Sequence, residues 1–270
     1  MVNNVPESLG EALRIRARAD VIPYGGGTDL MVAPKQGATY LFLHKVPEMR
    51  GISDDGAYIR IGASRTFSEV AESPICPAIL REAILQIAAP AIRNLGTIGG
   101  NIGNGSPKAD TAPVFYVTGA AVRLMSESGE RILPIREFYL GRNKTALKPD
   151  ELIVEVLMPK PVPARYYYRK VGGRQALAIS RISFAGILEE TGGRIASCAV
   201  AIGAVSDTII WRDDIDAMLV GKSIAETKAL KSEYLAAYDA AIEPLRGRVS
   251  SGYRKSVCMN LLNDFLDTLL

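Results

Sequence analysis

The stretch of sequence that says most about the fold is Ile92-Arg93-Asn94-Leu95-Gly96-Thr97-Ile98-Gly99-Gly100-Asn101-Ile102. Clustered glycines let backbone N–H groups approach an anion without interference from Cβ atoms. Loops of this kind bind anions, and a helix that begins at the loop adds the positive end of its dipole. Taken alone, the stretch also fits an ordinary turn, because Gly and Asn are common turn residues.

A second glycine loop lies upstream, at Tyr24-Gly25-Gly26-Gly27-Thr28-Asp29-Leu30. Its Thr28 and Asp29, like Thr97 and Asn101, could reach phosphate and ribose oxygens, or could cap turns. Neither loop reads GxGxxG, and no acidic residue ends a second strand about 20 residues later, so a Rossmann site is disfavoured. A dinucleotide would have to lie between the two loops, as an extended ligand such as FAD requires.

Composition is that of an ordinary globular protein. The 270 residues are 48% hydrophobic and 23% charged, which predicts one large domain or two modest ones. The net charge of +3 is too small and too dispersed to indicate nucleic-acid binding. A single histidine, His44, excludes a His-rich metal site and is interpreted as structural.

The three cysteines, Cys76, Cys198 and Cys258, are far apart and form no CxxC pair. We therefore expect no zinc or iron–sulfur cluster on this chain, and three buried, reduced thiols. Residues 1–10 contain no basic region followed by an apolar run, so no secretory signal is expected. The apolar stretches at 84–92 and 114–122 are too short to cross a bilayer. These features predict a cytoplasmic protein.

Periodicity and capping residues predict the elements. Capping boxes at Ser8/Glu11 and Thr66/Glu69 begin helices. In the last helix an apolar stripe of every fourth residue, Tyr253, Val257, Leu261 and Phe265, is expected to pack on a hairpin sheet. Helices are predicted at 9–18, from 66, and at 79–89 (stopped by Pro90), 110–118, 213–220 (closed by Gly221), 224–240 and 253–269. Strands are predicted at 20–23, 40–43, 58–61, 121–125, 152–158, 182–188 and 195–205, with a linker at 159–163.

The glycine loops and three further segments resemble the FAD-binding subunits or domains of the molybdenum hydroxylases, the xanthine dehydrogenase and carbon monoxide dehydrogenase type. Ser106-Pro107-Lys108-Ala109-Asp110 is similar to a third FAD loop. Tyr168-Arg169-Lys170-Val171-Gly172-Gly173-Arg174 resembles the opening of their C-terminal domain, and Ser251-Gly252-Tyr253-Arg254-Lys255 the start of their final helix. The resemblance covers essentially the whole chain in order.

The resemblance implies an α+β, vanillyl-alcohol-oxidase-type FAD-binding fold. Residues 1–160 would form the FAD-binding domain, with a small N-terminal lobe at about 1–55 and a second lobe at about 56–160 that clamp FAD. Residues 165–270 would form a C-terminal flavoprotein domain of sheet and helices. Many relatives have a small residue where this chain has Tyr24, so an aromatic ring is expected to shield or stack near the first loop. Asn104-Gly105 also departs from the common pattern.

The resemblance also implies which residues bind the cofactor. Residues 25–30 would bind the pyrophosphate, and residues 97–101 would close on it from the other side. Asp110 has an alternative interpretation as a helix N-cap, Lys170 as a solvated lysine, and Ile153 as an ordinary core residue. The implied FAD-binding residues are Tyr24, Gly25, Gly26, Gly27, Thr28, Asp29, Leu30, Thr97, Ile98, Gly99, Gly100, Asn101, Asn104, Asp110, Ile153 and Lys170.

By resemblance, the chain is the FAD-carrying electron-transfer subunit of a multi-subunit oxidoreductase. Partner chains would carry molybdopterin and 2Fe–2S clusters, and electrons would pass through the flavin to NAD+ or another acceptor. No acid–base residue on this chain is then required, because the flavin carries the redox chemistry. The alternatives are a free-standing FAD oxidoreductase of the same fold, a flavin-free assembly subunit and, least favoured, a nicotinamide dehydrogenase with a Rossmann core.

Overall fold

The computed structural model describes residues 4–245, 247 and 249–270. Contacts divide the chain into two compact units. Unit 1 contains the described residues of Met1–Pro77, Ala88–Ser106 and Gly119–Pro161, and unit 2 those of Ala78–Ile87, Pro107–Thr118 and Val162–Leu270. Residues 1–3, part of the stretch considered for a secretory signal, lie outside the described residues.

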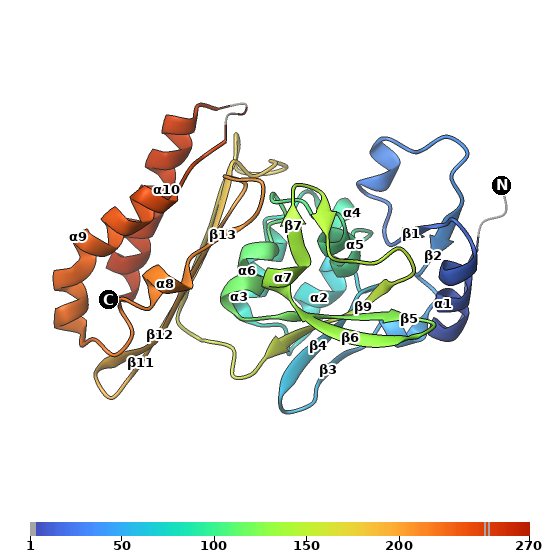
Figure 1. Cartoon of the computed structure of the whole chain (residues 1–270), viewed down its shortest axis with the longest axis horizontal. Coiled ribbons are helices and arrows are strands. Elements are labelled where there is room, and N and C mark those ends of the chain that lie inside the picture. The colour runs from blue at the N-terminus through green and yellow to red at the C-terminus, as the bar shows by residue number, and fades with distance from the viewer. Residues whose placement is uncertain (1–3, 246, 248) are drawn as a thin grey trace. The chain divides into compact units, whose positions relative to one another are not determined.

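Unit 1 is built on a five-stranded antiparallel sheet in the order β3-β4-β9-β5-β6 (Figure 1). The central strand β9 pairs with β4 on one side and β5 on the other. Most of its residues are buried, which explains its continuous apolar sequence. The strands are β3 (Ile52–Asp54), β4 (Tyr58–Gly62), β5 (Ala121–Ser126), β6 (Gly129–Pro134) and β9 (Leu152–Pro159).

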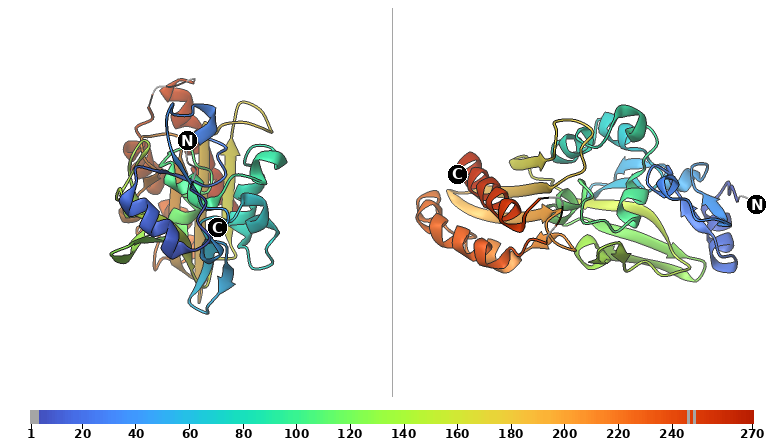
Figure 2. Two further views of the ribbon diagram at one scale, coloured as in Figure 1. Left: turned by 90° about the vertical axis from the view of Figure 1, so that its right-hand side faces the viewer. Right: turned by 90° about the horizontal axis from the view of Figure 1, so that it is seen from above.

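The N-terminal part of unit 1 groups α1 with a parallel pair of short strands, as the blue segment in Figure 2 shows. Ser8 accepts a hydrogen bond from the Glu11 N–H at the start of α1, but the Glu11 carboxylate accepts from Glu7, so the predicted capping box forms only in part. The predicted box at Thr66 and Glu69 is complete. These and the remaining elements of unit 1 are α1 (Leu9–Arg18), β1 (Ile22–Tyr24), η1 (Leu30–Val32), β2 (Tyr40–Phe42), η2 (Pro47–Met49), α2 (Phe67–Glu72), α4 (Pro90–Arg93), α5 (Ile98–Gly103), α7 (Ile135–Phe138), β7 (Tyr139–Gly141) and β8 (Lys144–Thr145).

Unit 2 is a four-stranded antiparallel sheet in the order β10-β11-β12-β13, covered by helices. The long strands β11 and β12 form the predicted hairpin, whose turn places Gly192 and Gly193 at φ values of 61° and 76°. Helices α9 and α10 lie on one side of this sheet and α3 and α6 on the other (Figure 1). The elements are α3 (Ala78–Leu85), α6 (Ala112–Val117), β10 (Tyr166–Val171), β11 (Ile182–Thr191), β12 (Arg194–Gly203), β13 (Ile210–Trp211), α8 (Asp213–Asp216), α9 (Ile224–Ala241) and α10 (Ser251–Leu269).

The stripe predicted for α10 is correct at Phe265, which is buried in the core, but diverges from the buried face toward the start of the helix. Tyr253 is 41% exposed, and Val257 and Leu261 lie at the border of the core. A spacing of four residues drifts by about 40° per step around a helix of 3.6 residues per turn. The buried face follows the mixed spacing of three and four instead, and its residues are Arg254, Cys258, Leu262, Phe265, Leu266 and Leu269.

Two predicted helices end four residues before their expected C-terminal residue. The helix predicted at 79–89 ends at Leu85, and Ala88 has a φ of 42°. Pro90 begins the next helix, α4, a position that suits its fixed φ and missing N–H. The helix predicted at 213–220 stops at Asp216 and continues as turns to Gly221, whose φ is 79°.

The cysteines of the described chain are free. Cys76 and Cys258 are buried, whereas Cys198 is only partly buried, which corrects the expectation of three buried thiols. Burial raises the pKa of the Cys258 thiol to about 12. Over the described residues, no helix is both long and apolar enough to span a membrane.

A buried carboxylate organises the core of unit 2. Asp216 Oδ1 accepts hydrogen bonds from the hydroxyls of Tyr234 (2.6 Å) and Tyr238 (2.7 Å), and its Oδ2 accepts from the Val200 N–H (2.8 Å). Burial raises the pKa of Asp216 to about 6, although these hydrogen bonds oppose the shift. These hydrogen bonds connect α8 and α9 to the inner strand β12.

Candidate functional site

The first glycine loop connects β1 to η1 and leaves a run of backbone N–H groups without acceptors. Gly27 has a φ of 71°, a conformation that side chains other than glycine rarely adopt. Among the described residues, the N–H groups of residues 25–29 donate to no protein acceptor. Successive free N–H groups of this kind are the donors of an anion-binding nest. We call residues 25–29 the nest.

The second loop leads into α5, whose first N–H groups already have acceptors. The Thr97 hydroxyl accepts from the Gly100 N–H (3.1 Å), and the Thr97 carbonyl accepts from Asn101 (3.0 Å). Ile98 N–H donates to the Arg65 carbonyl (3.0 Å) and Gly99 N–H to the Ala63 carbonyl (2.9 Å). Free N–H donors for an anion therefore come from the nest rather than from this helix start.

The glycines of α5 have different surroundings. Gly99 is buried, and a Cβ atom built on it would lie 2.6 Å from Ala63 Cβ. Gly100 is exposed, and a Cβ atom there would approach only the Thr97 hydroxyl, at 2.9 Å. Gly103 is also exposed, with its Cβ position 3.4 Å from the Ile153 side chain. Gly99 serves packing, whereas Gly100 and Gly103 give α5 a smooth accessible surface.

The two loops, about seventy residues apart in sequence, touch within unit 1. A Cβ atom on Gly25 would lie 2.4 Å from Thr97 Oγ1, and one on Gly26 would lie 1.7 Å from the Leu95 carbonyl oxygen. Asn104 Nδ2 also donates to Asp29 Oδ2 at 3.0 Å. The first loop can approach the second this closely only because residues 25 and 26 are glycines.

The predicted aromatic ring near the first loop belongs to Tyr24 and is packed. Its ring centroid lies 4.5 Å from that of Phe42 and 5.7 Å from that of Tyr40. The Tyr24 hydroxyl oxygen would be 1.9 Å from a Cβ atom on Gly27. The phenol hydroxyl therefore lies against Gly27, within the nest.

Ile153 is a buried residue of β9, 7% exposed, and its side chain supports α5 beside Gly103. The contact places it directly behind the second glycine loop, so it is a core residue by packing. His44 is exposed and contacts the Phe42 ring edge, with centroids 6.3 Å apart.

Asp110 and Lys170 form a separate cluster in unit 2. Lys170 Nζ lies 2.7 Å from Asp110 Oδ2 and donates to the Gln86 carbonyl at 2.8 Å, and both charged side chains are less than one-tenth exposed. Ser180 donates to Asp110 Oδ1. Burial raises the pKa of Asp110, and the Lys170 ammonium opposes that shift.

This geometry excludes the alternative interpretations of Asp110 as a helix N-cap and of Lys170 as a solvated lysine, and their role at the cofactor stays a prediction. The residue at the N-cap position of α6 is Thr111, so Asp110 is not the cap. Lys170 is buried rather than solvated. Sequence reasoning missed Ser180 and the carbonyl of Gln86, which complete the cluster. Neither residue stands out in sequence, because the contacts join residues that are 70 and 84 positions apart.

The nest fits the diphosphate of a dinucleotide, because its run of unpaired N–H groups suits a doubly charged anion. In the part of the chain that the structure describes, no group of three or more His, Cys, Asp or Glu residues could hold a metal ion.

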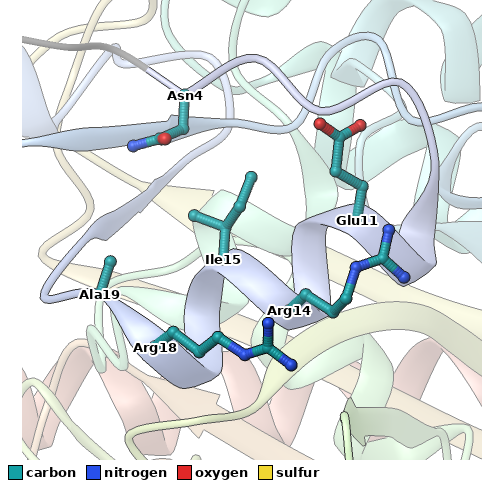
Figure 3. Close-up of a pocket in the computed structure, with 6 residues that line it drawn as sticks. All are labelled: Asn4, Glu11, Arg14, Ile15, Arg18 and Ala19. Atoms are coloured by element: carbon teal, nitrogen blue, oxygen red, sulfur yellow. The ribbon is translucent and has the colours of Figure 1, made fainter.

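A different hollow lies along α1 (Figure 3). Ile15 points toward Asn4, while Arg14 and Arg18 occupy successive turns of the helix. The hollow is lined by Asn4, Glu11, Arg14, Ile15, Arg18 and Ala19 and contains none of the predicted site residues.

Two touching glycine loops beside a five-stranded antiparallel sheet, followed by a sheet-and-helix unit, make a mixed α+β fold rather than a Rossmann fold. The model of the FAD-binding domain in molybdopterin dehydrogenase matches residues 4–161, and that of the CO dehydrogenase flavoprotein C-terminal domain matches residues 166–269. The chain belongs to this family of FAD-binding oxidoreductase domains, which confirms the prediction of family, fold class and cofactor class.

Individual relatives agree. The chain is 29% identical over 259 residues to the carbon monoxide dehydrogenase medium chain of Afipia carboxidovorans, covering 92% of this chain and 89% of that protein. It is 33% identical over 198 residues to a xanthine dehydrogenase FAD-binding subunit of Escherichia coli, covering 68% and 67%. The structure of a Cu,Mo-CO dehydrogenase chain superposes with a TM-score of 0.90 at 27% identity, covering 100% of this chain and 99% of that one.

Proposed function

We propose that this chain is the FAD-carrying subunit of a multi-subunit molybdopterin dehydrogenase. The observation that carries the proposal is the nest, a run of free N–H groups at residues 25–29 pressed against the start of α5. The domain assignment that goes with it is 1–160 for the FAD-binding domain, with lobes at about 1–55 and 56–160, and 165–270 for the C-terminal domain.

Within the site, we assign the residues as follows. The nest and Leu30 would hold the diphosphate, and the accessible face of α5 around Gly100 would limit the space on the other side. Asp29 and Asn104 would keep the two loops together through their hydrogen bond. Ile153 would support α5 from behind. Asp110 and Lys170 remain proposed cofactor residues on the strength of the sequence motif.

Bound FAD would supply a redox centre that takes electrons from 2Fe–2S clusters of a partner chain and passes them to NAD+ or another acceptor. The chain's own residues would bind the FAD and hold it in a fixed orientation. Relatives are named as medium chains or FAD subunits of dehydrogenases, which supports membership of an assembly of several chains. We propose two partners for this chain, an iron–sulfur subunit and a molybdopterin subunit, and a cytoplasmic location.

The visible absorption spectrum of the purified full chain, with identification of the flavin released on denaturation, tests the proposal. We expect flavin bands and roughly one FAD per chain. A protein that stays colourless after addition of FAD would overturn it and favour a flavin-free assembly subunit.

Affinity purification from the native host separates the proposed subunit from a free-standing flavoenzyme. Stoichiometric iron and molybdenum should accompany the tagged chain if it belongs to a multi-subunit dehydrogenase. A yellow chain that purifies alone, with oxidoreductase activity of its own, would favour the free-standing enzyme.

A further inference from the structure

The Tyr24 side chain is held in a fixed position by its neighbours. Tyr24 is the last residue of β1 and stands opposite Phe42 in the parallel β1–β2 pair. The Phe42 ring packs at 4.5 Å with an interplanar angle of 44°, and the Tyr40 ring meets it edge-on at 5.7 Å and 74°. Aromatic pairs at these distances and tilts are mutually attractive. The phenol therefore presents its hydroxyl at a defined place.

That place is the surface of the nest. A Cβ atom built on Gly27 would lie 1.9 Å from Tyr24 Oη and 2.3 Å from Cζ, so the hydroxyl touches the Gly27 backbone in the middle of the free N–H run. Among the described residues, no side chain or carbonyl pairs with this hydroxyl. A preorganised O–H donor without a partner thus lies beside five N–H donors without partners.

We propose that the Tyr24 hydroxyl is a further hydrogen-bond donor to the diphosphate of the dinucleotide, acting together with the nest. This inference rests on the proposed function, because it presupposes that the nest binds the diphosphate of FAD. A hydroxyl that donates to a charged oxygen makes a short, charge-assisted hydrogen bond. Its donation requires no movement of the ring, since the aromatic contacts already hold it.

Tyr40 provides a matched control in the same aromatic group. Its hydroxyl is buried and has no hydrogen-bond partner, and its ring packs against both Tyr24 and Phe42. Tyr40→Phe therefore removes one hydroxyl from the group without removing the one that touches the nest. A buried hydroxyl without a partner contributes nothing to stability, so this variant is expected to fold normally.

The test is a titration of the flavin-free full chain with FAD, ADP and riboflavin, in the wild type, Tyr24→Phe and Tyr40→Phe. ADP carries the diphosphate without the flavin ring, and riboflavin the ring without the phosphates. Loss of a hydrogen bond to a charged group weakens binding roughly 10- to 100-fold. We expect Tyr24→Phe to raise the Kd for FAD and for ADP by a similar factor in this range, with riboflavin unchanged and Tyr40→Phe like the wild type.

The possible results test the role of the Tyr24 hydroxyl separately from FAD binding by the chain. Wild-type binding of FAD together with an unchanged Kd for Tyr24→Phe would overturn the inference alone. A Tyr24→Phe defect that appears with riboflavin but not with ADP would also overturn it, because the residue would then act on the ring. A wild-type chain that binds neither FAD nor ADP would overturn the proposed function and the inference with it.

Discussion

Removal of Lys170 should lower the stability of unit 2, because it breaks a buried ion pair. The Lys170 ammonium and the Asp110 carboxylate are 7% and 8% exposed and 2.7 Å apart. Lys170→Met would leave the carboxylate buried with only the Ser180 hydroxyl for compensation. Loss of one member of a buried pair costs about 3–5 kcal/mol of unfolding free energy, a large part of the stability of an ordinary domain.

The loss should depend on pH. Burial already raises the pKa of Asp110, and Lys170 opposes the shift, so removal of the lysine lets that pKa rise further. A carboxyl whose folded pKa is raised contributes stability that is fully present below its unfolded pKa, near 3.9, and lost as pH rises through the folded pKa. The deficit of Lys170→Met is therefore expected to be small near pH 4 and largest at pH 8.

Urea unfolding followed by the fluorescence of Trp211 measures this effect, because the single tryptophan of the chain lies in β13 of the same unit. Lys231→Met is the matched control, since Lys231 pairs with the exposed Asp267 and surface pairs contribute little. A deficit no larger than that of Lys231→Met, or one that does not grow with pH, would refute the reasoning.

Two further predictions separate packing, binding and titration. Gly99→Ala should destabilise the chain by about 1–3 kcal/mol through overpacking against Ala63. Gly100→Leu should weaken FAD binding at least several-fold, and it should also cost about 0.5–2 kcal/mol of stability because its Cβ atom would press on the capping Thr97 hydroxyl. Gly252→Leu, at another exposed glycine in the first turn of a helix, should leave FAD affinity unchanged, and equal FAD affinity in all three variants would contradict this. The pKa of Asp216 is raised to about 6, so this carboxyl contributes stability that is present below its unfolded pKa and declines as pH rises through about 6. Asp216→Asn should remove this decline from the urea midpoints measured between pH 4 and 8. A variant whose midpoints fall with pH as steeply as those of the wild type would show that another group causes the decline.

The closeness of the two glycine loops could be predicted from local sequence. The glycine clusters predicted two loops around one ligand, and the structure brings Gly25 against Thr97. The sequence alone could not show that Gly99 and Gly100 have different roles. Adjacent glycines look alike in sequence, and only the position of Ala63 makes one of them a packing residue and leaves the other accessible.

Among the helices and strands, features that depend on neighbouring residues were also predicted better than features that depend on distant ones. The hairpin of β11 and β12 was predicted because its turn residues act locally, and the helix start at Thr66 because its capping box is contained in four residues. The buried face of α10 was predicted correctly only at Phe265, since a spacing of four residues and the helical period of 3.6 diverge along the chain. The burial of Lys170 depends on Asp110, sixty residues away, and no local pattern reports such a contact.

The path of the chain between the two units limits how such a protein can be divided. Unit 2 takes α3 and α6 from the N-terminal half of the sequence, and Pro113 in α6 packs against Gly203 at the end of β12. A recombination breakpoint at residue 162 would therefore sever two helices from the sheet that they cover, and would leave apolar strand surface bare on the C-terminal piece. Each unit packs as a separate body, but the segments that form the two units alternate along the sequence. Recombination between homologous genes is therefore expected to exchange both units together.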